Sequence, residues 1–311
     1  LIGYAGDTEA DRRGHDKRVE SLTDEFWYGS DGEGRIRWYA PLGAEVEKAW
    51  KAEGRGPLLV IEEAERVATR NMLEQVFGLP RDAWFVALHV REPGFHASWH
   101  KSHPGTRHAD IASYDGVIDL VTQAGGWVVR LGDRSMKPIA PRAQVIDYAT
   151  SSFRNFELDV FLCGACTYFV GTNSGLSLLP PLFGRRCVLT NWSPIAIPNW
   201  YLDDIYIPKL VRLVKDGRHL TFKEMYGSAA GWTQWRRDYP EGLQVIEDND
   251  PEDLIDAVQE LHDEVVAGKG PGSDDLALTA RYNAIAVAGG SYVGSRIGVR
   301  FLGKYRHLLD A

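Results

Sequence analysis

The stretch Tyr168-Phe169-Val170-Gly171-Thr172-Asn173-Ser174-Gly175-Leu176-Ser177-Leu178-Leu179 predicts how this chain folds. Its short opening run of apolar and aromatic residues is typical of a buried parallel strand. The small polar residues 171–175 then allow a tight turn and offer Asn173 or Ser174 as a helix cap. A helix beginning there would point backbone N–H groups into the crevice beyond the strand, where a phosphate can bind. The simpler interpretation is a plain strand-to-helix connection that binds nothing.

Strand and helix patterns alternate on both sides of this stretch. Strands are expected at 35–40, 58–61, 84–90, 127–131, 145–148, 168–170, 187–190 and 243–246. Helices are expected at 44–52, 62–77, 110–123, 155–165, 174–183, 250–266, 276–287 and 295–309. Short connections between such elements predict a parallel sheet with right-handed crossovers, in which ligands bind beyond the carboxyl ends of the strands.

The composition indicates a globular protein, with 311 residues of which 44% are hydrophobic and 25% charged. The net charge of -8 argues against a general nucleic-acid binder. The three cysteines, Cys163, Cys166 and Cys187, are too few for a disulfide framework and predict packed thiols in a reducing cytoplasm. The sequence contains no apolar run of the roughly 20 residues that a membrane span needs, and its first residues do not resemble a signal peptide.

Polar side chains follow successive predicted strands. They are His89 and Arg91, then Arg130 and Asp133, then Thr172, Asn173 and Ser174. His89 and Arg91 alternate along a strand end, so both side chains point the same way. An arginine can bind two phosphate oxygens at once, and together with the turn after Gly171 it describes a diphosphate site. The usual dinucleotide fingerprint and the P-loop motif are both absent from the sequence, which favours a protein that uses a nucleotide sugar.

Several ordered blocks of the sequence resemble a largely uncharacterised bacterial family that is classed with the glycosyltransferases. These blocks are His89-Val90-Arg91-Glu92-Pro93-Gly94-Phe95, Gly126-Trp127-Val128-Val129-Arg130-Leu131-Gly132-Asp133, Val145-Ile146-Asp147-Tyr148-Ala149, Phe169-Val170-Gly171-Thr172-Asn173-Ser174-Gly175-Leu176 and Ile207-Pro208-Lys209-Leu210. They fall within about residues 75–265. The H-x-R strand end and the later G-T-x-S turn are also distantly similar to fucosyltransferases of the two-lobed GT-B type.

This resemblance implies an α/β fold with a Rossmann-like donor domain of the GT-B type at residues 81–265 and a smaller or partial N-terminal lobe on the acceptor side at residues 1–80. The C-terminal helices, 266–311, would pack back on that lobe. The implied diphosphate-binding residues are His89, Arg91, Thr172, Asn173, Ser174 and Gly175. The residues implied for the nucleoside are Arg130, Gly132 and Asp133.

The expected reaction moves a hexosyl or deoxyhexosyl group from a nucleotide-diphosphate sugar, with GDP or UDP favoured, to a hydroxyl or amine of a small molecule or glycan. No metal and no further cofactor are expected if Arg91 and the helix terminus stabilise the leaving diphosphate. The general base is left open among Glu92, His96, His100 and Asp7, with Glu92 and His100 favoured. The oligomeric state is also left open, and a homodimer is one alternative.

Other interpretations remain open for parts of the sequence. His96, His100, His103 and His108 gather in one loop, but their spacing matches no standard zinc site, and a weakly basic lid or a solvated loop explains them better. Among the tryptophans, Trp192 and Trp200 are the best candidates to face a cleft. A phosphohydrolase or non-glycosyl transferase would need carboxylates such as Asp133 and Asp147, and a degenerate binding module would keep Arg91 without chemistry.

Overall fold

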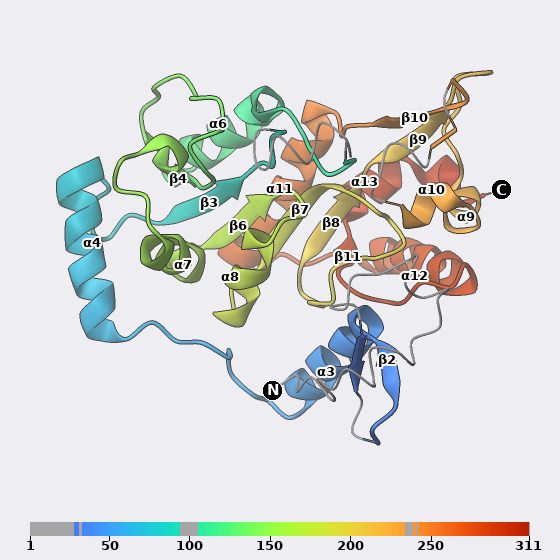
Figure 1. Ribbon diagram of the computed structural model, residues 1–311, viewed down its shortest axis with the longest axis horizontal. Helices are drawn as coiled ribbons and strands as arrows, with labels where there is room; N and C mark the ends of the chain where they lie inside the picture. The colour runs from blue at the N-terminus through green and yellow to red at the C-terminus, as the bar shows by residue number, and fades with distance from the viewer. Residues whose placement is uncertain (1–27, 31–32, 94–104, 234–238, 241, 311) are drawn as a thin grey trace, which may run out of the picture.

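The computed structural model describes residues 28–30, 33–93, 105–233, 239–240 and 242–310. Its centre is one seven-stranded sheet in which every neighbouring pair of strands is parallel (Figure 1). The strands lie in the order β11-β8-β7-β6-β3-β4-β5. In chain order they are β3 (Phe85–His89), β4 (Trp127–Arg130), β5 (Val145–Ile146), β6 (Tyr168–Gly171), β7 (Cys187–Trp192), β8 (Ile205–Pro208) and β11 (Arg296–Ile297).

The predicted α/β alternation is confirmed. Strands β3 and β6 at the centre are buried along their whole length, as expected for a parallel sheet covered on both faces. The helices α6 (Asp115–Gln123) and α11 (Pro251–Ala267) pack on each other, and α11 lies behind the sheet in Figure 1. The helices α7 (Phe156–Ala165) and α8 (Leu179–Leu182) contact each other and lie nearer the viewer.

The described chain before β3 forms one antiparallel hairpin and two helices. The hairpin joins β1 (Tyr28–Ser30) to β2 (Ile36–Trp38), and the helices are α3 (Tyr39–Ala52) and α4 (Glu63–Phe77). The start of α3 packs through aromatic rings. The ring centroids of Tyr39 and Trp200 lie 5.4 Å apart, and those of Trp38 and Tyr292 lie 5.7 Å apart. A long connection separates α3 from α4, which lies at the far left of Figure 1. These elements do not make a second sheet-based lobe within the described residues.

The C-terminal part adds a hairpin and several helices beside the β8–β11 end of the sheet. They are β9 (Leu210–Leu213), β10 (Gln244–Glu247), α9 (Phe222–Tyr226), α10 (Ala229–Trp232), α12 (Ser273–Ala288) and α13 (Val299–Lys304). Three buried tyrosines tie this part to the sheet, because the hydroxyl of Tyr282 lies 2.6 Å from that of Tyr206 and 2.7 Å from that of Tyr226. These hydroxyl contacts join α9 and α12 to β8.

Several predicted elements are wrong or shortened. The helix expected at 174–183 is a 3₁₀ turn, η4 (Leu176–Leu178), followed by the four-residue α8, because Pro180 and Pro181 fit only a first turn. The strand expected at 58–61 is an irregular segment that meets α8, where the Leu59 N–H donates to the Leu182 carbonyl at 2.8 Å. The strand expected at 35–40 ends at Trp38, since Pro41 sits inside the first turn of α3.

The strand expected at 243–246 is confirmed as β10, and it pairs with β9 outside the parallel sheet. The single helix expected at 295–309 is wrong, because that segment forms β11, α13 and the 3₁₀ turn η6 (Arg306–Leu309). The true edge strand is β11, inside a segment predicted as one helix. Cys163 and Cys166 are buried free thiols at the end of α7, and burial raises the pKa of both, as the prediction of packed thiols requires.

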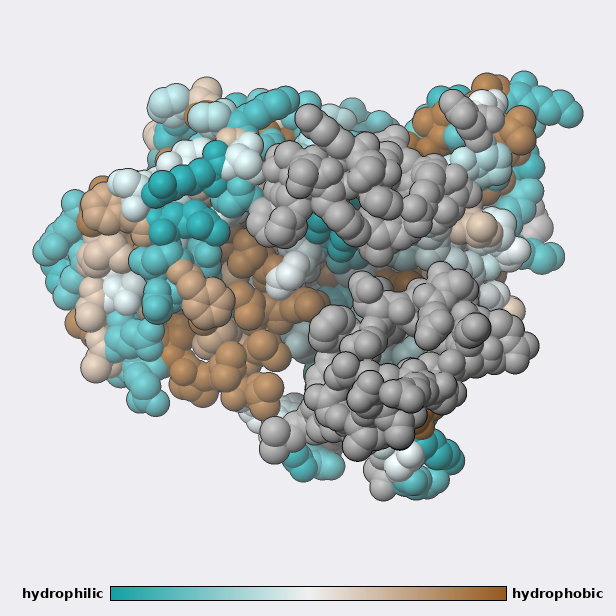
Figure 2. Space-filling model, viewed as in Figure 1, coloured by the Kyte–Doolittle hydropathy of each residue, from teal (hydrophilic) through white to brown (hydrophobic). Residues whose placement is uncertain are grey.

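Apolar residues remain exposed on one face, where brown gathers over the lower left of Figure 2. The exposed large apolar side chains in the segments around α7 and α8 include Leu58, Val60 and Phe156. No helix in the described part of the chain has both the length and the apolar character needed to cross a membrane.

Candidate functional site

The loops after β3 and β6 leave the sheet side by side. In the register of these two strands His89 lies opposite Gly171. The backbone N–H of Thr172 donates to the His89 carbonyl at 3.0 Å, and the backbone N–H of Arg91 donates to Oγ1 of Thr172 at 2.9 Å. The structure therefore places Arg91 at the same edge of the sheet as residues 172–174, as the sequence predicted. In the chain, 81 positions separate Arg91 from Thr172.

The turn after β6 is held by its own polar groups. A Cβ on Gly171 would lie 2.5 Å from the His89 carbonyl oxygen, so only glycine allows the two strands to approach so closely. The Asn173 side-chain amide donates to the Ser193 carbonyl at 3.1 Å, and Ser177 Oγ donates to the Ser174 carbonyl at 2.7 Å. The Ser174 hydroxyl is buried without a hydrogen-bond partner among the described residues. Because Gly175 precedes a short 3₁₀ turn, the strong helix dipole that the sequence predicted here is missing.

A second segment, residues 106–109, closes over this edge. Oγ1 of Thr106 lies 2.6 Å from Oγ of Ser193, which follows β7. The Ala109 N–H donates to the Arg91 carbonyl at 3.1 Å. Nζ of the buried Lys209 donates to the His108 carbonyl at 2.6 Å. The backbone on both sides of Arg107 is therefore fixed to the ends of β3, β7 and β8.

Two arginines share this edge. Burial lowers the pKa of Arg107 to about 10, and the nearby positive charge of Arg91 lowers it further, while the Tyr39 hydroxyl acts in the opposite sense. Burial also lowers the pKa of Arg91. Both guanidinium groups stay charged at neutral pH, because arginine titrates far above it. A guanidinium group can bind two oxygens of an anion at once, so both arginines are candidates to bind an anionic ligand.

His89 contributes a buried, uncharged ring to this edge. Its side chain is 6% exposed, and burial lowers its pKa to about 4, so the ring is neutral at pH 7. Nδ1 lies 3.1 Å from the Leu131 carbonyl oxygen and must donate to it, which leaves Nε2 as an acceptor. The neighbouring charges of Arg91, Asp133 and Arg130 also act on its pKa, so the ring lies between the β3 and β4 ends.

Arg130 and Glu92 lie in a buried ion network instead of at the Arg91 edge. The Arg130 side chain is fully buried, and its Nη1 donates to Asp147 Oδ1 at 3.0 Å and to the Lys137 carbonyl at 2.7 Å. Its Nη2 lies 3.5 Å from Oε2 of Glu92. That oxygen also accepts the Lys137 N–H at 2.9 Å. The network braces residues 132–139, so these two side chains support the loop predicted to face a nucleoside.

The remaining nucleoside candidates lie in the loop after β4. Gly132 has a φ of +154°, and a Cβ there would lie 2.1 Å from Sδ of Met136, so the turn requires glycine. Oδ1 of Asp133 accepts the Ser135 N–H at 2.7 Å, which fixes the carboxylate near His89. This loop lies next to the β3 end because β3 and β4 are neighbours.

Several predicted residues lie elsewhere. Asp7, His96, His100 and His103 fall outside the described residues. Trp192 is core, 5% exposed, with Nε1 donating to the Ile197 carbonyl at 2.9 Å. Trp200 is half-buried against Tyr39. Among the described residues, no group of three or more histidine, cysteine, aspartate or glutamate side chains is arranged to hold a metal ion.

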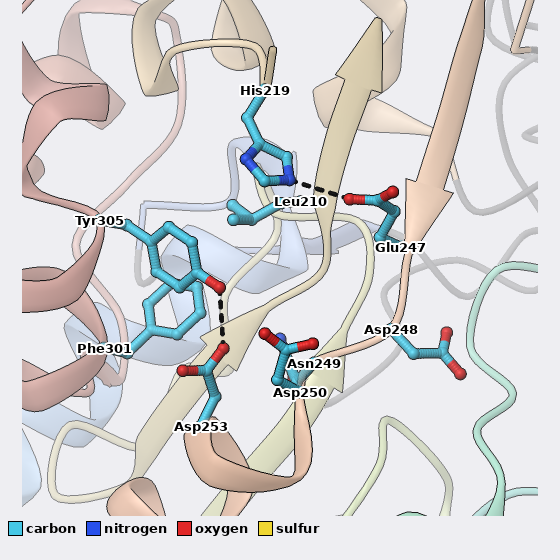
Figure 3. A pocket seen from close by; sticks show the side chains of 9 residues that line it. All are labelled: Leu210, His219, Glu247, Asp248, Asn249, Asp250, Asp253, Phe301 and Tyr305. Carbon is cyan, nitrogen blue, oxygen red and sulfur yellow. Dashed lines mark hydrogen bonds and ion pairs between the residues drawn. The ribbon is translucent and has the colours of Figure 1, made fainter. Parts of the chain in front are cut away.

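A separate pocket of about 350 Å³ lies between the β9–β10 hairpin, the start of α11 and α13 (Figure 3). Figure 3 shows four carboxylates around it, together with His219 and two aromatic rings. The carboxylates belong to Glu247, Asp248, Asp250 and Asp253. Because these groups repel phosphate, the pocket is a poor anion site, in contrast to the Arg91 edge. The two regions are linked, since Asp248 Oδ1 accepts from Lys209 at 2.5 Å.

Comparisons of the chain with models of known protein families, with curated proteins and with solved structures gave no match.

Sequence reasoning missed Arg107 and Lys209 as residues of this edge. The strand-end rule is the expectation that polar residues directly after parallel strands line a ligand site, and it identified Arg91. It applies equally to Lys209, which directly follows β8. Arg107 follows no strand and lies in a loop that sequence analysis interpreted only as weakly basic. Nothing local in the sequence reveals that Thr106 and Ala109 bring Arg107 back to the sheet.

Proposed function

We propose that the protein is a glycosyltransferase that uses a nucleotide-diphosphate sugar, with residues 81–265 as a donor domain of the GT-B type. The observation that carries this proposal is that Arg91 follows β3 and that the neighbours of Arg107 bind the same edge, through Thr106 with Ser193 and through Ala109 with the Arg91 carbonyl. In open parallel sheets this edge is where nucleotide ligands bind. The ordered sequence blocks that resemble glycosyltransferases support the same function, because they supply most of the residues at this edge.

The reaction needs positive charge where the leaving group forms. The bond between the anomeric carbon and the β-phosphate oxygen breaks, and its electron pair stays on the diphosphate. A new bond joins the anomeric carbon to the acceptor oxygen or nitrogen, whose proton passes to a base. Because the diphosphate gains one negative charge, the guanidinium groups of Arg91 and Arg107 stabilise the transition state more than the bound sugar nucleotide. The same charges would take the place that a divalent cation occupies in metal-dependent transfer.

Two further residues, the neutral His89 and the carboxylate of Asp133, extend the site away from the phosphates. His89 presents Nε2 as an acceptor, and Asp133 presents a carboxylate held by the Ser135 N–H. These groups suit the hydrogen-bond donors of a nucleoside or sugar better than a phosphate, which offers only acceptors at neutral pH. The proposed order is therefore phosphates at Arg91 and Arg107, and the nucleoside toward the loop after β4.

Calorimetry tests the proposal. The purified chain is titrated with GDP-, UDP-, dTDP- and CMP-sugars, with and without EDTA. We expect one of the diphosphate-linked donors to bind, independently of EDTA, and Arg91→Ala to weaken that binding by ~2 kcal/mol or more, as loss of a charge-assisted pair does. Binding of none of them would contradict the proposed function, and loss of binding in EDTA would favour a metal-dependent enzyme.

A further inference from the structure

Ser193, directly after β7, joins two loops of the proposed site, the segment 106–109 and the turn after β6. Its hydroxyl lies 2.6 Å from Oγ1 of Thr106, and both side chains are buried. Its carbonyl accepts the side-chain amide of Asn173, in the turn after β6, at 3.1 Å. Separating the buried hydroxyls would leave polar groups without a partner, which is unfavourable. The position of Ser193 therefore fixes how the two loops lie relative to each other.

The strand β7 carries a bulge just before Ser193. Three steps along β7, from Leu189 to Trp192, lie opposite two steps along β8. Within this stretch Asn191 has a φ of +51°, in the left-handed region that asparagine adopts more readily than most side chains. A bulge turns the residues that follow it away from the direction of a regular strand. The bulge therefore sets the direction in which Ser193 leaves the sheet.

A second asparagine, Asn249, holds the bulge in this conformation. The Asn191 N–H donates to Oδ1 of Asn249 at 2.5 Å, and the Asn249 N–H donates to Oδ1 of Asn191 at 2.8 Å. The side-chain amide of Asn249 donates to the Pro208 carbonyl, at the end of β8, at 2.8 Å. Both asparagines are buried. The shape of the bulge thus depends on a residue that belongs to neither loop and lies just before α11.

The side chain of Asn191 also reaches the turn after β6 through two buried hydroxyls. Its amide donates at 3.1 Å to the hydroxyl of Tyr114, which lies 2.6 Å from Oγ1 of Thr190. Thr190 donates to the Gly171 carbonyl at 3.2 Å, so the Tyr114 hydroxyl must be the donor to Thr190. Every proton of these two hydroxyls is then used. The asparagine pair is thereby connected to the residue at which the turn begins.

We propose that Asn191 and Asn249 are a positioning pair, which holds the β7 bulge and, through Ser193, presets both loops for their ligand. That the ligand is a nucleoside diphosphate rests on the proposed function. The pair itself rests on the hydrogen bonds between buried side chains and on the register shift of β7. Neither asparagine touches the ligand. Their effect is that the loops already have the bound arrangement before the ligand arrives, which lowers the ordering cost of binding.

Calorimetry of the full chain with GDP and UDP tests the proposal. For the diphosphate that binds, Asn249→Ala should lower the affinity about fivefold or more, because the bulge loses both side-chain bonds of Asn249. The matched control is Asn199→Ala. Asn199 is also buried, but its amide donates to Asp204 at 3.0 Å, at the amino ends of the strands. The control should lose thermal stability and keep the affinity within about twofold. An affinity within twofold of wild type in folded Asn249→Ala overturns the proposal.

A double-variant cycle separates positioning from a general loss of structure. Ser193→Ala removes the hydroxyl that contacts Thr106, so it should weaken binding by itself. If Asn249 acts through Ser193, the loss of affinity in the double variant should be smaller than the product of the two single losses. A loss equal to that product would overturn the proposed route through Ser193.

Hydrogen exchange of the free protein keeps the two proposals distinct. If neither GDP nor UDP binds the wild type, the proposed function fails, and exchange then tests the pair alone. Asn249→Ala should speed exchange in peptides that contain Ala109 and Thr172, whose N–H groups donate to carbonyls at the end of β3, and leave peptides of α4 unchanged. Unchanged exchange in both loops overturns the proposal. If Asn249→Ala does not fold, Asn191→Gly replaces it in each measurement with the same criteria, because it keeps the left-handed backbone and removes the side chain.

Discussion

The arginines at two neighbouring strand ends have opposite surroundings. Arg130, at the end of β4, lies between the carboxylates of Glu92 and Asp147 and is closed off from solvent. Arg107, at the β3 and β7 ends, has Arg91 beside it. The fold itself places carboxylates beside Arg130, whereas no carboxylate of the described residues is among the groups that act on the pKa of Arg107. Arg130 therefore has a structural role, whereas Arg107 is the better candidate to bind an anion.

The largest expected effect comes from Arg130. The substitution Arg130→Met would leave Glu92 and Asp147 facing each other without a cation, so we expect the free energy of unfolding to fall by about 3–5 kcal/mol. Urea denaturation measures it. Arg142 pairs with the exposed Asp115 at 2.9 Å and Asp119 at 3.3 Å, so Arg142→Met serves as the control and should cost less than about 1 kcal/mol. Equal losses would remove the distinction between the two regions.

The buried Lys209 connects the segment that contains Arg107 to the acidic pocket. Lys209→Met removes the cation from Asp248 and the donor from the His108 carbonyl. Asp248 is half-exposed and can be rehydrated, so we expect a loss of about 2 kcal/mol in unfolding free energy. Because Arg107 precedes His108, donor affinity should also fall several-fold. The exposed Lys215→Met is the control, and a stability loss with unchanged donor affinity would separate Lys209 from the site.

The neutral His89 makes stability depend on pH. Its pKa is about 4 in the folded chain against an ordinary 6.5, so below pH 6.5 the unfolded chain binds a proton that the folded chain does not. Above pH 6.5 the folded and unfolded chains do not differ in proton binding at His89. As the pH drops from 6.5 toward 4, the free energy of unfolding falls, by about 1–2 kcal/mol at pH 5. The difference between pH 7 and pH 5 should shrink in His89→Gln. An unchanged difference would show that the ring is not held neutral.

The smallest effect concerns the arginine pair without ligand. Arg107→Gln removes one of two repelling charges, so the free protein should be as stable as wild type or more stable by about 0.5 kcal/mol. Thermal unfolding with and without pyrophosphate checks both states. A variant that is clearly less stable in the absence of ligand would mean that Arg107, like Arg130, is a structural cation.

The strand-end rule predicted much of this arrangement from the sequence. Buried runs such as Phe85–His89 and Tyr168–Gly171 identified the central strands, and their ends identified Arg91 and Thr172 as neighbours. The rule could not separate Arg91 from Arg130, because the carboxylates of Glu92 and Asp147 reach Arg130 only through the folded loops. It also missed the short helix after Gly175, where two prolines outweighed an apolar pattern, and Arg107, which depends on hydrogen bonds between distant segments.

The most direct test is a crystal structure of the protein with the nucleoside diphosphate that binds in solution. We expect the two phosphates to lie at the ends of β3 and β6, with the guanidinium groups of Arg91 and Arg107 both within hydrogen-bond distance. A diphosphate bound elsewhere, or held at this edge without Arg107, would contradict the proposed site.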